Sequence, residues 1–231
     1  MLDKAAYEFA DMQSMLDAAE KLYGPYPWGP LRRAGPAAQL PLWRHGKPDA
    51  HLRPPPHRPG RRPLAGLAGR HELAHSWSGN LVTNATWEDF WLNEGFTNYF
   101  ENRIMEQVYG KDDADMLKVL NYGDLQETLK GLKDNPEFTK LHPDLKGVNP
   151  DDYFSDVPYE KGASFLRMLE AHFGRKTFDA YLRGYFSRYA FHSMTTEAFL
   201  VDLRQKPAAQ RRRPGKGPED PGMGLRHRPA R

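Results

Sequence analysis

Two histidines four residues apart are the part of this sequence that most clearly calls for a chemical explanation. They stand in the run His71-Glu72-Leu73-Ala74-His75. Residues with this spacing lie on one face of a helix, so both imidazoles would point the same way. Two neutral imidazoles on one face suit Zn²⁺, and Glu72 beside them could reach a metal-bound water whose pKa the ion lowers to about 7. The run therefore predicts a zinc site.

Glu94 is the candidate third ligand. Eighteen residues lie between His75 and Glu94, which stands in an aromatic-rich stretch expected to form a second helix. We expect this helix to be buried on one side and to pack antiparallel to the first, with Glu94 facing the histidines. Three protein ligands leave a fourth position for water, which is typical of a catalytic zinc site. Asn98 and Glu101, one and two turns further on, could orient the ligands, although a solvated helix face explains them equally well.

The alternative for these residues is two core histidines and a surface acid. The spacing, the helical context and the local aromatic residues agree with one another, and together they disfavour that alternative. The other histidines lack partners at ligand spacing and are expected at the surface: His45, His51, His57, His142, His172, His192 and His227.

The elements that must position the site are predicted to be mostly helical. Apolar residues recur at helical spacing in seven stretches. These are residues 3–23, 67–78, 87–109, 112–131, 159–173, 175–188 and 195–205. A polar loop with three prolines is expected over 133–152.

The charge of the chain is unevenly distributed. Its net charge is +3, but residues 30–70 carry +8 and residues 206–231 carry +6, which leaves −11 on the remaining 164 residues. Because the two basic tracts lack interleaved aromatic residues, nucleic acid is not expected as a partner. No apolar run is long enough to span a bilayer, so no membrane partner is expected. The absence of cysteine excludes disulfides and thiolate ligands.

Several motifs together resemble the zinc aminopeptidases of the leukotriene A4 hydrolase type, which are gluzincins with an HExxH-x18-E pattern. They are the metal motif itself, His-Ser-Trp-Ser-Gly-Asn-Leu-Val-Thr-Asn at 75–84, Trp-Leu-Asn-Glu-Gly-Phe at 91–96 and Pro-Tyr-Glu-Lys-Gly at 158–162. The resemblance covers about 1–29 and 71–205. It implies an α+β, predominantly α fold, namely a thermolysin-like catalytic domain with a small β lobe, together with one Zn²⁺ per chain and peptide substrates.

The same resemblance assigns roles to individual residues. The metal ligands would be His71, His75 and Glu94, and Glu72 would be the general base. Tyr159 would stabilise the tetrahedral oxyanion, although a tyrosine packed on the core at a helix start is the simpler alternative. Asp151 aligns with a carboxylate placed near the substrate. Epoxide hydrolysis of the leukotriene kind is implied by the resemblance alone.

One family segment is missing from this chain. Members carry Gly-x-Met-Glu-Asn ahead of the zinc helix, and its glutamate holds the free amino group of the substrate. In its place residues 30–70 form a tract rich in Pro and Arg. Residues 43–48 can be written in codons that, read one base along, give Gly-Gly-Met-Glu-Asn-Pro, and the tail from Lys206 similarly gives Asn-Leu-Leu-Arg-Asn-Asp. We therefore hypothesise that both tracts are out-of-frame translations, which resequencing of the locus would test.

This departure defines the expected organisation and activity. We predict an N-terminal helix of the catalytic domain (1–29), an aberrant tract that disrupts the β lobe (30–70), a zinc-peptidase core (71–205) and a disordered basic tail (206–231). The zinc helix is expected to start late and fray at His71. The chain should bind zinc with little aminopeptidase activity, so a non-catalytic zinc-binding fragment and an endopeptidase remain alternatives. The expected compartment is the cytoplasm, with the parent's N-terminus missing, and the oligomeric state is open.

Overall fold

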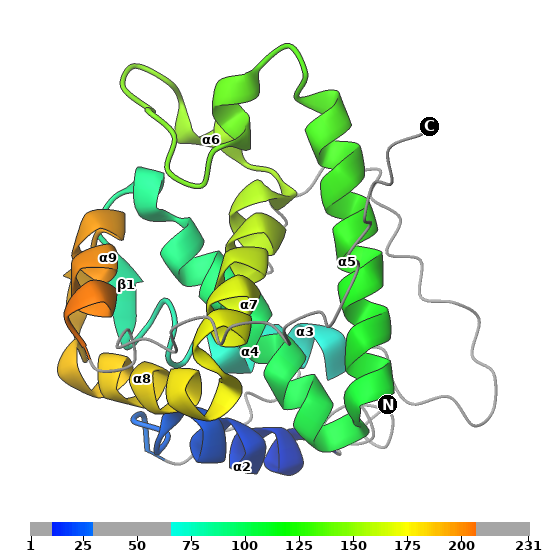
Figure 1. Ribbon diagram of the computed structural model, residues 1–231, viewed down its shortest axis with the longest axis vertical. Helices are drawn as coiled ribbons and strands as arrows, with labels where there is room; N and C mark the ends of the chain where they lie inside the picture. The colour runs from blue at the N-terminus through cyan, green and yellow to red at the C-terminus, as the bar shows by residue number, and fades with distance from the viewer. Residues whose placement is uncertain (1–10, 30–65, 207–231) are drawn as a thin grey trace, which may run out of the picture.

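The computed structural model describes residues 11–29 and 66–206, and side chains are described in the second range from Gly69 onward (Figure 1). Residues 3–10 of the predicted helix 3–23 lie outside these residues, as do the tract 30–65 and the tail 207–231 with the hypotheses on them. The α-helices are α2 (Met12–Tyr23), α3 (Gly66–Ala74), α4 (Trp91–Tyr109), α5 (Lys111–Gly131), α6 (Pro150–Tyr153), α7 (Gly162–Phe173), α8 (Arg175–Arg188) and α9 (Thr196–Gln205). The shorter elements are the strands β1 (Val82–Asn84) and β2 (His192–Met194), the 3-10 turns η1 (Trp87–Asp89) and η2 (Pro136–Thr139), and the π-helix η3 (Val157–Lys161).

Helix α4 runs through the middle of the described fold. It contacts α2, α3, α5, α7, η3 and β1. Figure 1 shows α5 along one side of it and α8 and α2 across one end. Thirteen of its nineteen residues are buried. Burial on one side only was therefore the wrong expectation, because helices pack against α4 from several directions.

Aromatic rings hold α4 in place. The Phe96 ring of α4 contacts Tyr185 and Phe186 of α8 and Phe199 of α9, with ring centroids 5.4 to 6.0 Å apart. All four side chains are at most 2% exposed. Burying a ring of this kind contributes about 1.5–3 kcal/mol. The helix that carries Glu94 is thus fixed by buried aromatic contacts with α8 and α9.

The helix boundaries differ from the predicted ones at both metal-site helices. Helix α3 begins at Gly66, five residues before His71, so the expected late start is wrong. It ends at Ala74 rather than at Ser78, because the chain turns back on itself after His75. The stretch 87–109 divides into η1 and α4, and the predicted helix from 159 begins as a π-helix.

A short parallel sheet joins the segment after the zinc motif to the segment between α8 and α9. Val82 of β1 pairs with His192 of β2, and Asn84 pairs with Met194. The described residues are otherwise mostly helical, in agreement with the predicted α+β, predominantly α class. Strand β1 leads directly into η1 and α4, so the sheet helps to set where α4 begins.

None of the described helices combines the length and the apolar character needed to cross a bilayer. The longest, α5, has 21 residues but carries eight charged ones. Membrane-spanning helices tolerate few or no charges.

Helices α4 and α7 meet through two glycines. A Cβ added to Gly95 would lie 2.8 Å from the Gly162 Cα atom and 3.0 Å from the Pro158 carbonyl oxygen. Both neighbours are backbone atoms, which cannot rotate away as a side chain can. The absence of a side chain at Gly95 therefore lets α4 approach η3 and the start of α7.

Replacing Gly95 by alanine should destabilise the fold by about 1–3 kcal/mol. The clash with the Gly162 backbone outweighs the gain of up to about 1 kcal/mol that alanine brings to a helix interior. Gly123 of α5 is the matched control, because a Cβ there meets no atom within 4 Å. Gly123→Ala should therefore be stabilising. Urea unfolding of the two variants measures both effects, and a Gly95→Ala protein as stable as Gly123→Ala would contradict the packing argument.

Candidate metal centre

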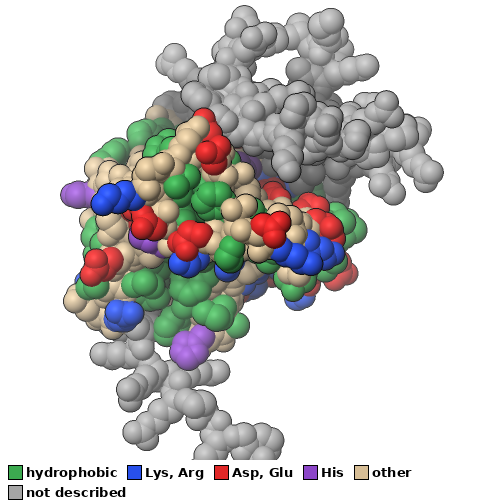
Figure 2. Space-filling view, turned by 90° about the horizontal axis from the view of Figure 1, so that it is seen from above, with side chains coloured by type: hydrophobic (Ala, Val, Ile, Leu, Met, Phe, Trp, Pro, Cys, Tyr) green, Lys and Arg blue, Asp and Glu red, His purple; other side chains and the backbone are tan. Residues whose placement is uncertain are grey.

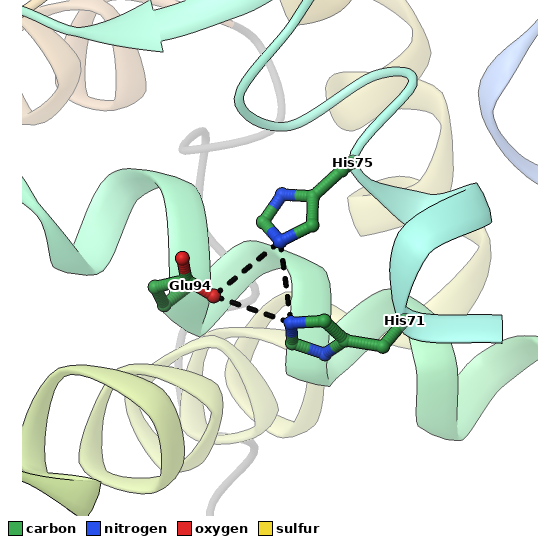
Figure 3. Close-up of side chains that lie close together, drawn as sticks. All are labelled: His71, His75 and Glu94. Carbon is green, nitrogen blue, oxygen red and sulfur yellow. Dashed lines mark hydrogen bonds and ion pairs between the residues drawn. The ribbon is translucent and has the colours of Figure 1, made fainter. Parts of the chain in front are cut away.

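His71, His75 and Glu94 converge on one point (Figure 3). The two histidine Nε2 atoms are 3.2 Å apart, and the Glu94 Oε2 atom lies 3.3 Å from that of His71 and 3.5 Å from that of His75. One histidine comes from α3, the second from the turn that ends it, and the glutamate from the first turn of α4. The structure thus brings the three predicted ligands together.

The dimensions of this triangle fit Zn²⁺. Ligand bonds of about 2.0–2.1 Å in a tetrahedral site place neighbouring ligand atoms about 3.3 Å apart. The three observed separations lie within a few tenths of an ångström of that value. Glu94 Oε2, moreover, is buried without a hydrogen-bond partner, which is costly for a carboxylate unless a cation satisfies it. The donor set of two imidazoles and one carboxylate is also that of catalytic zinc sites.

The charges of the centre attract a cation. Burial works against a charged His71 ring, but the nearby Glu101 and Glu94 carboxylates outweigh it and raise the pKa of His71 to about 10. Burial likewise disfavours the Glu94 carboxylate, but the adjacent His71 and His75 rings outweigh it and lower its pKa to about 2. Glu94 is therefore ionised at neutral pH. Without a metal, a proton on His71 supplies the positive charge that a bound ion would supply. Metal binding must therefore release this proton.

Backbone and hydroxyl groups orient the His75 ring. Its Nδ1 atom lies 2.9 Å from the Ser78 carbonyl oxygen and 3.1 Å from the Thr97 hydroxyl. Donation from Nδ1 to the carbonyl leaves Nε2 free for a metal. Gly79 makes this turn possible, since its φ is +114° and a Cβ there would lie 2.9 Å from His75 Nδ1. These orienting groups were not predicted, although Thr97 lies one turn after Glu94 on the same helix.

His71 is held by a different kind of partner. Its Nδ1 atom lies 3.5 Å from Oε2 of Glu101, which agrees with the expected orienting role of that residue. Asn98 instead donates to Glu160 at 2.7 Å. Asn121 of α5 donates to the same Glu160 oxygen, also at 2.7 Å. Asn98 therefore anchors the π-helix to α4, rather than contacting a ligand.

Tyr159 stands beside the metal triangle. Its ring stacks on that of His71 with centroids 6.3 Å apart, and it belongs to the π-helix η3. Single-turn π-helices are frequent at functional sites. Burial raises the pKa of Tyr159, and the negative charges of Glu94, Asp156 and Glu72 raise it further, so the phenol keeps its proton. A protonated phenol beside the centre can donate a hydrogen bond.

The remaining predicted residues lie at the surface. Glu72 is exposed on α3 between the two histidines, and Asp151 is exposed in the first turn of α6. His142, His172 and His192 are also exposed, and the other four histidines lie outside the described residues. Figure 2 shows acidic and basic side chains interspersed with apolar ones on one face of the described fold.

A helix pair that presents His-x-x-x-His and a following glutamate to one cation site defines a zinc metallopeptidase of the gluzincin arrangement. A family model described as "Peptidase family M1 domain" matches residues 68–212. The chain therefore belongs to peptidase family M1, and within it resembles the leukotriene A4 hydrolase type.

Relatives of known name agree with this assignment. Leucine aminopeptidase 2 of Yarrowia lipolytica is 38% identical over 206 residues, and that of Ajellomyces capsulatus is 39% identical over 210. The alignments cover 86% and 87% of this chain but 32% of each relative. The chain thus spans about a third of the length of these relatives.

Solved structures give the same result for the fold. Yeast leukotriene A4 hydrolase in complex with bestatin superposes with a TM-score of 0.73 and 31% identity, covering 90% of this chain and 34% of that one. An M1 zinc metallopeptidase from Deinococcus radiodurans gives a TM-score of 0.56 at 22% identity, covering 87% and 42%. The second likeness concerns the fold alone.

Proposed function

We propose that this chain carries, in residues 71–205, the catalytic core of a zinc-dependent aminopeptidase that hydrolyses N-terminal peptide bonds. The observation that carries the proposal is the ligand triangle of His71, His75 and Glu94, with ligand separations of 3.2 to 3.5 Å. The naming of the fungal relatives as leucine aminopeptidase 2 favours peptide N-termini as substrates.

Glu72 is proposed as the general base. When bound, Zn²⁺ would supply Lewis acidity, lowering the pKa of a coordinated water and polarising the substrate carbonyl. Glu72 is exposed on α3 between His71 and His75 in the sequence, so its carboxylate is accessible to water and can accept a proton. It would take this proton from the attacking water and pass it to the leaving amine.

Tyr159 is proposed to stabilise the oxyanion. Its raised pKa keeps the hydroxyl protonated over the whole physiological range, so it can donate to the negative oxygen that develops on the carbonyl carbon. Glu160, the next residue, is fixed by Asn98 and Asn121. The π-helix is thereby tied to α4 and α5, which limits how far the phenol can move.

Asp151 is proposed as a substrate-binding residue. It is exposed in the first turn of α6, where its backbone N–H donates to the Asn149 side chain. This role is implied only by the resemblance to the leukotriene A4 hydrolase type.

A non-catalytic zinc-binding fragment is the alternative. It is favoured by the sequence itself, which lacks the Gly-x-Met-Glu-Asn segment that holds the substrate's amino group in this family. Without that anchor, zinc could bind while substrates are poorly positioned. An endopeptidase is a further alternative, because the anchor is what restricts cleavage to the N-terminus.

Hydrolysis of leucyl-arylamide by the full chain separates these possibilities. We expect slow cleavage that is lost on chelation and restored by one equivalent of Zn²⁺. The matched substrate is the N-acetylated leucyl-arylamide, which should not be cleaved by an aminopeptidase. One bound zinc without any zinc-dependent cleavage would support the fragment, whereas equal cleavage of internal bonds in N-blocked peptides would support the endopeptidase.

A further inference from the structure

A row of charged side chains leads from the metal centre into the protein. Oε2 of Glu101 lies 3.5 Å from Nδ1 of His71, and Oε1 of the same carboxylate lies 3.5 Å from Nη2 of Arg70. The Glu101 side chain is 11% exposed and that of Arg70 is 3% exposed. One buried carboxylate is therefore shared between a metal ligand and an arginine.

Arg70 is incompletely paired for a buried cation. Its Nε and Nη2 atoms have no hydrogen-bond partner among the described residues. Besides Glu101, the guanidinium contacts the face of Tyr109, with its Cζ atom 5.8 Å from the ring centroid. A buried cation is costly unless an opposite charge is close, so Glu101 must offset much of the cost of burying Arg70.

The contact between Glu101 and His71 affects a candidate metal ligand directly. A carboxylate that accepts from Nδ1–H fixes the tautomer, keeps Nε2 free and makes the ring a stronger donor. In this chain Arg70 forms an ion pair with the other oxygen of that carboxylate. It reduces the negative charge available to His71 and adds a positive charge behind the metal centre.

His75 provides an internal comparison. Its Nδ1 partners are the neutral Ser78 carbonyl and the Thr97 hydroxyl. The Nδ1 side of the His75 ring therefore contacts no charged group through these two partners. The contacts of Arg70 therefore reach a candidate ligand by way of Glu101 and His71, and not by way of His75.

We propose that Glu101 is a positioning residue that holds His71 for metal binding, and that the buried Arg70 lowers the affinity of the centre for Zn²⁺ by sharing the same carboxylate. The inference rests on the zinc site of the proposed function but not on peptide hydrolysis. Glu101 acts on the metal only through His71, and Arg70 acts through Glu101.

The experiment measures the Zn²⁺ affinity of the full chain by competition with a colorimetric chelator at one fixed neutral pH. Glu101→Gln should weaken zinc binding by about 10- to 100-fold, as loss of an orienting partner does. Arg70→Met, which keeps the length and removes the charge, should strengthen it about tenfold. Arg70→Lys keeps the charge and should show no such gain. Lys130→Met, which removes an exposed cation on α5, is the control expected to bind zinc as wild type does.

Two further variants distinguish position from charge. Glu101→Asp keeps the charge but withdraws the oxygen, and it should bind zinc about as weakly as Glu101→Gln. In a Glu101→Gln background, most of the gain from Arg70→Met should disappear. Circular dichroism of the metal-free proteins checks that each variant is folded. If Glu101→Gln or Arg70→Met does not fold, Glu101→Asp and Arg70→Lys still test the inference.

Several outcomes would overturn the inference. They are wild-type zinc affinity in Glu101→Asp, unchanged or weaker binding in Arg70→Met, and failure of both the wild type and Arg70→Met to take up Zn²⁺. The readout does not depend on catalysis. The expected affinity shifts without any hydrolysis of leucyl-arylamide would therefore count against the proposed function and support the inference.

Discussion

Replacing Glu72 by glutamine is expected to leave zinc binding unchanged and to lower peptide hydrolysis by about 10² to 10⁴-fold, the usual contribution of a positioned general base. Glutamine has the same shape but cannot accept the proton of the attacking water. Glu72 is exposed and does not belong to the ligand triangle, so its neutralisation should not disturb His71, His75 or Glu94. Zinc stoichiometry and leucyl-arylamide turnover measured on the same preparation give both quantities.

Two further variants are measured in the same way. Glu127→Gln, an exposed glutamate on α5, is the matched control and should retain wild-type turnover. Tyr159→Phe keeps the ring that stacks on His71 and removes only the hydroxyl. Loss of one oxyanion donor typically costs about 10² to 10³-fold in rate, so this variant should also bind zinc and turn over slowly. A Glu72→Gln chain with wild-type turnover would rule out Glu72 as the base.

The convergence of the candidate metal ligands could be predicted from the sequence because their geometry is local. His71 and His75 are separated by about one helical turn, and the sequence alone fixes that they share a face. Glu94 required a further step, the packing of a second helix, and its aromatic surroundings indicated that packing. The structure places all three ligand atoms within 4.8 Å of one another.

The groups that orient the ligands could not be predicted in the same way. The Ser78 carbonyl reaches His75 only because α3 ends at Ala74 and the chain turns back through Gly79. Backbone carbonyls carry no sequence signal. Thr97 follows Glu94 by one turn, but its hydroxyl has many possible partners until the turn is known. The burial of Arg70 is harder still to predict, because arginine is usually exposed.

Helix ends were the least predictable part of the fold. The helical spacing of apolar residues extends beyond Ala74, where the structure has a turn. It also begins ahead of Gly162, where the structure has a π-helix. Both departures are set by contacts between elements. The π-helix is tied to α4 through Glu160 and passes close to Gly95, and periodicity within one segment does not report such contacts. These departures lie at the metal site, where local preference and function most often conflict.

Removing one metal ligand is expected to have the largest effect on zinc binding. Structural zinc sites bind with roughly 10–16 kcal/mol, so one ligand accounts for about 3 kcal/mol or more, which corresponds to an affinity loss on the order of 10² to 10³-fold. His75→Ala leaves His71 and Glu94, and two ligands cannot hold the ion against a chelator. Glu94→Gln should act similarly, because it removes the only anionic ligand of the triangle. Equilibrium dialysis against trace zinc measures the loss.

The same variants should lose the stabilisation that zinc gives to the fold. An ion that binds only the folded chain raises its stability by about 4 kcal/mol at a thousand times its dissociation constant. The ligands come from α3, the turn that follows it and α4, so zinc links these elements directly and its binding should raise the melting temperature of the wild type. His75→Ala and Glu94→Gln should show no rise at the same zinc concentration. His172→Ala, an exposed histidine at the end of α7, should retain it. A zinc-dependent rise that persists in the two ligand variants would place the ion elsewhere and remove the basis of the peptidase assignment for this site.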